Sequence, residues 1–335
     1  MQTLAEFLPL FRTLGDREAL RFHNGYRTWR ASYRDLEARI GAVVAYLDSN
    51  GISKGDRVLL WGENRLEWTA VFWACVARGV ELVPIDFHSS TRFLARIHQQ
   101  VRGRLLIFGE EVDATELEVD KLSFREVADL PAPVERFEPS AISRDDVVEI
   151  VFTSGTTGEP KGVVHRHKNI CANLTPIHKE IKRFRWLARP FQPLRFLNLL
   201  PLSHMFGQTA GLYIPPLLGG AVVFTQLLNP GAILETIHRE RVSVLVSVPR
   251  LLRNLRNEIN RRFETGAEAG AFQGVLGAAE SWWKHRQVHG ALGWKFWALV
   301  VGGAQLDSEL EGFWRQLGFV VVQGYGLTEA SPVVA

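Results

Sequence analysis

Twelve residues at positions 151–162, VFTSGTTGEPKG, combine three glycines, four hydroxyl side chains and one lysine at the end of an apolar strand pattern. Glycine lets the backbone approach a ligand closely, and exposed N–H groups in such a turn form a concavity that binds anions. Neutral donors come from the hydroxyl groups of Thr153, Ser154, Thr156 and Thr157. With the positive charge of Lys161, this combination indicates phosphate binding. Composition alone favours an ordinary surface turn, so the spacing has to decide.

The spacing of the glycines separates the known classes of phosphate loop. A Walker loop requires G-x-x-x-x-G-K-[ST], but the fifth residue after Gly155 is Pro160. The same count from Gly158 reaches Val163. A dinucleotide-binding turn requires G-x-G-x-x-G before a helix, but GYGLTE has Glu329 at the third glycine position. Neither class is predicted.

The stretch TSGTTGEPKG instead resembles the phosphate loop of the adenylate-forming superfamily, which includes acyl-CoA synthetases, luciferases and peptide-synthetase adenylation domains. Further motifs follow in the order of that family: LPLSHMFG at 200–207, VVGGAQL at 300–306 and QGYGLTEASP at 323–332. The resemblance extends over the chain from about residue 25 and is most like that to fatty-acyl-CoA synthetases. It implies an acyl-CoA synthetase-like N-terminal domain.

The resemblance also implies roles for single residues. The β- and γ-phosphates of ATP would bind Lys161 and the loop residues Thr153, Ser154, Gly155, Thr156, Thr157 and Gly158. Adenine would lie against the residues Gly303, Ala304, Gly324, Tyr325 and Gly326. Thr328 would contact the α-phosphate, and Glu329 would bind Mg²⁺ together with Thr153. His204 would lie between the acyl pocket and the reacting carboxylate.

The chemistry implied is attack of a carboxylate on the α-phosphorus of ATP, with release of pyrophosphate. Donors and a metal ion must then stabilise charge on the leaving oxygens. The nucleophile is already an anion at neutral pH, so no general base is needed. Simpler roles remain open: Glu329 as a solvated carboxylate, Tyr325 as a packing residue and His204 as a core histidine.

The substrate is predicted from one missing residue type. Relatives that adenylate amino acids place an aspartate beside the substrate-side motif, and LPLSHMFG has none. We therefore expect a carboxylic acid with an uncharged acyl chain, a fatty acid, with coenzyme A as acceptor. An aryl-CoA ligase is the alternative, as is a nucleotide- or acyl-binding module that is catalytically incomplete. Family members continue past the position of Ala335 into a C-terminal domain, so we expect that domain to be absent and this chain alone not to complete the reaction.

The elements that must position these motifs alternate between helix and strand patterns. Residues 32–51 predict a helix that begins at Ser32 and ends at Gly51, and residues 57–86 predict a strand, a helix and a second strand. This alternation predicts an α/β fold with two mostly parallel sheets and flanking helices.

The expected domain organisation follows from a change in composition. Residues 110–147 are charged and contain three prolines, which predicts an irregular connection. We expect one α/β lobe over residues 1–140 and a second over residues 141–335, with the phosphate loop and the adenine-side motifs in the second.

Composition limits the remaining classes. The chain has 335 residues, 46% of them hydrophobic, and its 39 basic and 36 acidic side chains give a net charge of only +3, so nucleic acid is not an expected partner. Cys75 and Cys171 form no C-x-x-C motif, and no signal peptide or membrane span is evident. A cytoplasmic protein is expected.

Residues 179–196 mix basic and aromatic side chains, which suits either peripheral contact with an anionic inner membrane surface or a solvated helix face. The oligomeric state is left open.

Overall fold

A computed structural model of the chain describes all residues except 134, 155–158, 185–190, 264–282 and 325–335. Its strands form two sheets. The seven-stranded sheet has the order β13 (Val320–Gln323), β12 (Ala298–Val301), β11 (Val244–Ser247), β9 (Arg195–Asn198), β10 (Ala221–Thr225), β1 (Glu18–His23) and β2 (Thr28–Ser32). The six-stranded sheet has the order β6 (Asp120–Ser123), β5 (Leu105–Phe108), β3 (Arg57–Trp61), β4 (Glu81–Ile85), β7 (Val147–Ser154) and β8 (Pro160–Arg166).

Both sheets are mostly parallel. In each sheet the antiparallel pair lies at one edge, β1 with β2 and β7 with β8, and the other pairs are parallel. The carboxyl ends of the parallel strands in one sheet therefore lie side by side, and ligands of open α/β sheets usually bind next to these ends.

The helices alternate with these strands along the chain. They are η1 (Leu4–Glu6), α1 (Phe7–Leu14), α2 (Tyr33–Ser49), α3 (Leu66–Arg78), α4 (Thr91–Val101), α5 (Phe124–Asp129), α6 (His167–Phe184), α7 (Met205–Gln208), the π-helical turn η3 (Thr209–Tyr213), α8 (Ile214–Leu217), α9 (Pro230–Arg239), α10 (Pro249–Phe263), α12 (Arg286–Leu292) and α13 (Ser308–Gln316). Among the helices described, none is long and apolar enough to cross a bilayer.

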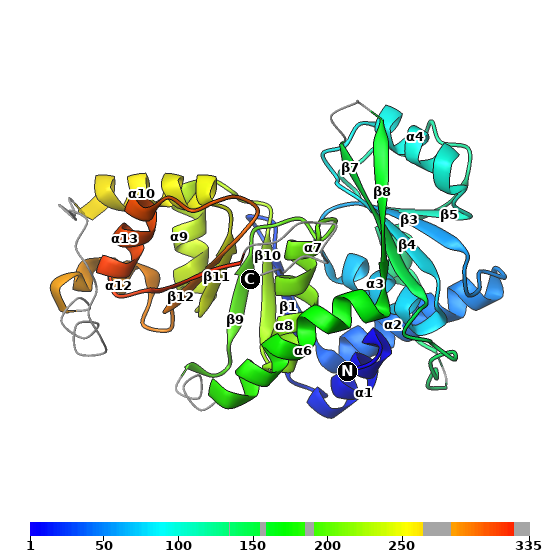
Figure 1. Cartoon of the computed structure of the whole chain (residues 1–335), viewed down its shortest axis with the longest axis horizontal. Coiled ribbons are helices and arrows are strands. Elements are labelled where there is room, and N and C mark those ends of the chain that lie inside the picture. The colour runs from blue at the N-terminus through cyan, green and yellow to red at the C-terminus, as the bar shows by residue number, and fades with distance from the viewer. Residues whose placement is uncertain (134, 155–158, 185–190, 264–282, 325–335) are drawn as a thin grey trace.

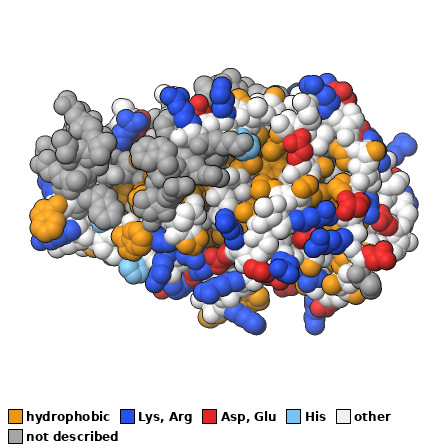
Figure 2. All heavy atoms as spheres, turned by 90° about the horizontal axis from the view of Figure 1, so that it is seen from below, with side chains coloured by type: hydrophobic (Ala, Val, Ile, Leu, Met, Phe, Trp, Pro, Cys, Tyr) orange, Lys and Arg blue, Asp and Glu red, His pale blue; other side chains and the backbone are white. Residues whose placement is uncertain are grey.

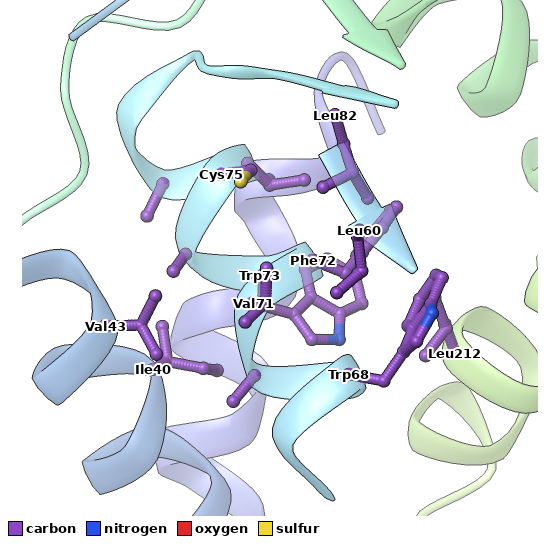
Figure 3. Close-up of a cluster of buried hydrophobic side chains, with 14 of the residues drawn as sticks. Ile40, Val43, Leu60, Trp68, Val71, Phe72, Trp73, Cys75, Leu82 and Leu212 are labelled. Carbon is purple, nitrogen blue, oxygen red and sulfur yellow. The ribbon is translucent and has the colours of Figure 1, made fainter. Parts of the chain in front are cut away.

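The elements pack in layers (Figure 1). Helices α9, α10, α12 and α13 cover the outer face of the seven-stranded sheet, and α4 packs on the six-stranded sheet. Helices α1, α2, α3 and α6 lie in the core that joins the two sheets. Figure 3 shows the centre of this core, where α3 lies between Ile40 and Val43 on one side and Leu60 and Leu212 on the other. These apolar contacts fix one sheet against the other.

The fold predicted from the sequence is confirmed. Helix α2 begins with a capping box in which Ser32 and Asp35 bond each other's backbone N–H groups, as expected for this start signal. The division of the strands between the two sheets does not coincide with a boundary at residue 140. Strands β1 and β2 belong to the same sheet as β9–β13, whereas β7 and β8 belong to the same sheet as β3–β6. The two lobes over residues 1–140 and 141–335 therefore stay a prediction.

Candidate functional site

A cavity of about 910 Å³ lies where the carboxyl ends of strands from both sheets meet. The six-stranded sheet contributes residues that follow β3 and β4, and the seven-stranded sheet contributes residues that follow β9, β10, β11 and β12. Representative members are Asn64, His88, Leu199, Gln226, Val248 and Gly303. Parallel strands bring these loops together although they are far apart in the sequence, which is the usual position of a ligand site in this class of fold.

His204 lines this cavity and pairs with Asp86, which directly follows β4. The distance from Nε2 of His204 to Oδ2 of Asp86 is 3.0 Å. Burial would raise the pKa of Asp86, but hydrogen bonds from His204 and from the His88 backbone N–H hold it below its ordinary value. An ionised carboxylate only accepts hydrogen bonds, so Nε2 of His204 carries the proton of this contact.

The short helix α7 carries the next cavity residue, Phe206, against the turn that follows β12. A Cβ atom on Gly302 would lie 2.6 Å from the Phe206 ring, and a Cβ atom on Gly324 would lie 3.2 Å from it. Gly303 in the same turn has a φ of +80°, in the left-handed region that glycine tolerates best. The substrate-side motif and the adenine-side turn therefore touch through one aromatic ring, with Ala304 exposed beside them.

The strands on either side of the predicted phosphate loop form an antiparallel hairpin. Thr153 in β7 lies opposite Lys161 in β8 in the strand register. Directly opposite residues of such a pair project from the same face, so both side chains leave the hairpin on one face. Lys161 is exposed, as a residue that binds phosphate from solution must be.

Several predicted site residues lie outside the described residues: Gly155, Thr156, Thr157, Gly158, Tyr325, Gly326, Thr328 and Glu329. Ser154 is the last residue of β7, and Gly324 directly follows β13. In the part of the chain that the structure describes, no group of three or more His, Cys, Asp or Glu side chains is arranged to hold a metal ion. The predicted ligands Glu329 and Thr153 thus stay a prediction.

Sequence reasoning missed three kinds of site residue. Asp86 could have been predicted from the sequence, because it is a carboxylate directly after a buried strand. Phe206 stands inside the substrate-side motif but gives no sign of its contact with Gly302. Glu111 and Gln226, which line the cavity and bond to each other, are 115 residues apart and share no local pattern.

The basic stretch 179–196 is only partly described. Within it, Arg195 belongs to β9 and is half-buried, and its Nε donates to Oε2 of Glu18 at 2.9 Å. That guanidinium is committed to an internal ion pair. On the face shown in Figure 2, Lys and Arg side chains are interspersed with Asp and Glu side chains. Membrane contact through this stretch stays a prediction.

The chain is similar to known proteins over most of its length. A model of the family described as AMP-binding enzyme matches residues 11–335. The feruloyl-CoA synthase of Amycolatopsis sp is 27% identical over 306 residues, which cover 90% of this chain and 55% of that protein. The long-chain-fatty-acid–CoA ligase FadD15 of Mycobacterium bovis is 27% identical over 349 residues, with 89% of this chain and 55% of that protein covered. The chain spans about half the length of the curated relatives it matches.

Among solved structures, the N-terminal domain of FACL13 from Mycobacterium tuberculosis has a TM-score of 0.76 with this chain at 23% identity. The match covers 99% of this chain and 77% of that one. It shows that the two chains share a fold.

Proposed function

Because the chain belongs to the family of AMP-binding enzymes, we propose that it binds ATP and a fatty acid and takes part in acyl-CoA synthesis. The acid's carboxylate oxygen attacks the α-phosphorus, the bond from that phosphorus to pyrophosphate breaks, and an acyl-adenylate forms. The thiol of coenzyme A then attacks the acyl carbon, loses its proton, and AMP leaves. The observation that carries this proposal is the single cavity that reaches His204, Phe206 and Gly303.

The described residues supply binding and orientation for this reaction. The Thr153–Lys161 pair offers a hydroxyl donor and a cation at the base of the glycine loop, which suits the β- and γ-phosphates. Gly303 permits close approach of a flat base to the backbone. His204, held by Asp86, lines the same cavity as Gly303. Mg²⁺, when bound with ATP, would offset charge on the leaving pyrophosphate.

A fatty acid is favoured by the apolar part of the lining. Much of the cavity wall is aliphatic or aromatic, as in Phe22, Leu199, Leu200, Phe206 and Leu228. An apolar chain gains free energy when it leaves water for such a wall. The aryl acids are the second candidate, because the polar side chains of His88, Glu111 and Gln226 also line the cavity and would bond a ring hydroxyl.

Calorimetry on this chain tests the nucleotide part of the proposal. AMP and MgATP should both bind, and Lys161→Ala should weaken MgATP by about 10- to 100-fold, because a charge-assisted hydrogen bond to phosphate is lost. AMP should bind that variant as well as the wild type, because it lacks the outer phosphates. Lys168→Ala is the matched control, since Lys168 pairs with Asp145 on the surface.

The substrate part is tested with hydrolysis-resistant acyl-adenylate analogues. Dodecanoyl, feruloyl and alanyl analogues should bind in that order of decreasing affinity. Tightest binding of the alanyl analogue would contradict the fatty acid proposal, and tightest binding of the feruloyl analogue would favour the second candidate.

A further inference from the structure

A carboxyl group outside the cavity contacts the helix on which the site depends. Glu149 lies in β7, the strand that leads into the predicted phosphate loop, and its side chain is fully buried. Its Oε2 accepts a hydrogen bond of 2.7 Å from Nε2 of Gln208, the last residue of α7. The Oε1 of Gln208 in turn accepts a hydrogen bond of 3.1 Å from the Tyr213 hydroxyl. Gln208 and Tyr213 are also fully buried.

We propose that Glu149 is a positioning residue, which holds α7 through Gln208 and thereby sets the positions of His204 and Phe206 in the cavity. The inference rests on the proposed function, because the cavity is taken as the place where the acyl-adenylate binds. Glu149 itself does not line the cavity. It contacts Gln208 in α7, the helix whose residues Phe206 and Gly207 do line the cavity.

Helix α7 is the first turn of a continuous helical segment, because η3 and α8 follow it without a break from Thr209 to Leu217. The π-helical turn η3 begins directly after Gln208, so the Glu149 contact lies where the hydrogen-bond pattern of the helix changes. The N-cap of α7 is His204, whose carbonyl accepts the Gln208 N–H at 3.0 Å. The Gly207 carbonyl accepts Nδ2 of Asn198 at 3.0 Å. Asn198 of β9 thus connects α7 to the seven-stranded sheet, and the Gln208–Glu149 bond connects α7 to the six-stranded sheet.

The same contact joins the two halves of the site. Glu149 and Thr153 belong to one strand, and Thr153 lies opposite Lys161 at the base of the phosphate loop. At the other end of the chain of contacts, Phe206 packs on Gly302. A change in the Glu149–Gln208 bond therefore alters the spacing between the phosphate side and the acyl side.

The charge state of Glu149 makes this contact sensitive to pH. Burial raises the pKa of Glu149 to about 8, although the Gln208 hydrogen bond opposes the shift. Within the described residues, its Oε1 has no hydrogen-bond partner, which disfavours a full negative charge. Three titratable side chains lie around it: His165 opposite in the strand register, Tyr213, and Cys171, which interacts with Tyr213. Burial raises the pKa of Cys171 to about 11 and that of Tyr213 well above its ordinary value, so neither ionises near pH 8.

The test measures the affinity of AMP and of a hydrolysis-resistant dodecanoyl-adenylate analogue for this chain at pH 7. Glu149→Ala and Gln208→Ala should each weaken the analogue by about 10-fold, and AMP by less, because the acyl part reaches α7. The double variant should be no weaker than either single one, since both remove the same contact. Glu149→Gln keeps the acceptor for Gln208 and should bind the analogue within about two-fold of the wild type.

Leu47→Ala is the control for a merely structural role. Leu47 is fully buried in α2 and does not line the cavity, so we expect its truncation to lower stability without moving α7. The control should bind both probes like the wild type. If Glu149→Ala binds the analogue as tightly as this control does, the inference about Glu149 is overturned and the proposed function is not. If the wild type binds neither probe, both the inference and the proposed function are overturned.

The pH profile decides the matter even if Glu149→Ala does not fold. Affinity of the wild type for the analogue should fall as pH rises from 7 to 9, because ionisation places a negative charge on a buried carboxyl group whose Oε1 has no hydrogen-bond partner among the described residues, and the packing around α7 must open to solvate that charge. Glu149→Gln should show a flat profile over that range. A fall that persists in Glu149→Gln and disappears in His165→Gln would assign the effect to His165 and overturn the inference.

Discussion

Two buried glutamates of this chain show opposite chemistry, and their surroundings explain the contrast. Glu149 lies in the core between the sheets, where its described partner is the neutral amide of Gln208, and burial raises its pKa to about 8. Glu240 follows α9 beside the seven-stranded sheet, is 3% exposed, and meets Arg21 and Arg239. Burial would raise its pKa too, but the hydrogen bonds and charges of these arginines hold it below the ordinary value.

The comparison teaches that burial alone does not fix the role of a carboxyl group. With guanidinium partners, Glu240 serves as an anion in an ion network that continues through Arg21 to Glu18 and Arg195. Without a cation, Glu149 serves as a neutral hydrogen-bonding group. The first arrangement links β1 and β9 of the seven-stranded sheet to the end of α9, and the second leaves a group whose charge changes near physiological pH.

The largest effect is expected when the ion pair between Arg21 and Glu240 is removed. Arg21→Met should lower the free energy of unfolding by about 3–5 kcal/mol at pH 7, because Glu240 would be left buried without its closest cation. The distance between Nη1 of Arg21 and Oε2 of Glu240 is 2.6 Å. Chemical denaturation measures the loss. The control Arg34→Met removes an exposed pair with Asp16 and should change stability by less than about 1 kcal/mol; equal losses in both would show that the Glu240 site is solvated.

The next effect is a difference in the direction of pH dependence. The folded pKa of Glu149 is raised, so the folded state keeps a proton that the unfolded state loses above its ordinary pKa, given as 4.5. Wild-type stability should therefore fall relative to Glu149→Gln between about pH 4.5 and 8, by up to about 1.4 kcal/mol per pH unit. The folded pKa of Glu240 is lowered, so its contribution is present above pH 4.5 and lost as pH falls.

Unfolding free energies of the wild type, Glu149→Gln and Glu240→Gln at pH 4 to 8 measure both slopes. Glu149→Gln should gain on the wild type as pH rises, and Glu240→Gln should lose. Curves that run parallel to the wild type for both variants would remove the contrast.

Local parts of this fold were predictable from the sequence. The helix start at Ser32 and the stop after α13 at Gly318 follow from capping and from a left-handed glycine, which act within a few residues. The strand patterns that place Thr153 before the phosphate loop also follow from local periodicity. The short elements β6 and α5 were expected to be irregular, because four and six residues are too few to show a period.

Contacts between distant residues were not predictable. Leu20 in β1 pairs with Val222 in β10 about 200 residues later, and no local pattern encodes that partner. Glu149 stands in the apolar run VVEIVF, which hints at a buried carboxyl, but Gln208 lies 59 residues away. The sequence therefore predicted the residues in the motifs and missed the contact between Glu149 and Gln208.

A third prediction disturbs α7 from the side opposite to Glu149. Gly302→Ala would place a Cβ atom 2.6 Å from the Phe206 ring, which must move. The variant should lose about 1–3 kcal/mol of stability, as overpacked sites do. Adding Phe206→Ala should recover part of that loss, and double-mutant denaturation measures the coupling. Strictly additive losses would mean that the ring already avoids Gly302.

The smallest expected effect on stability comes from a carboxylate pair that is open to solvent. Asp86 pairs with His204 as Glu240 pairs with Arg21, but the His204 side chain is 57% exposed. Asp86→Asn should therefore change the free energy of unfolding by less than about 1 kcal/mol at pH 7. The lowered pKa of Asp86 means that its contribution is lost as pH falls below about 3.8, so the two proteins should converge in acid. The ligand response should be larger than the stability response, because an asparagine amide can donate as well as accept and so no longer fixes which ring nitrogen of His204 carries the proton. Calorimetry with the dodecanoyl-adenylate analogue, beside denaturation of the same samples, measures both. A loss of several kcal/mol in stability with unchanged affinity would place Asp86 with Glu240, as a structural anion, and would take His204 out of the site.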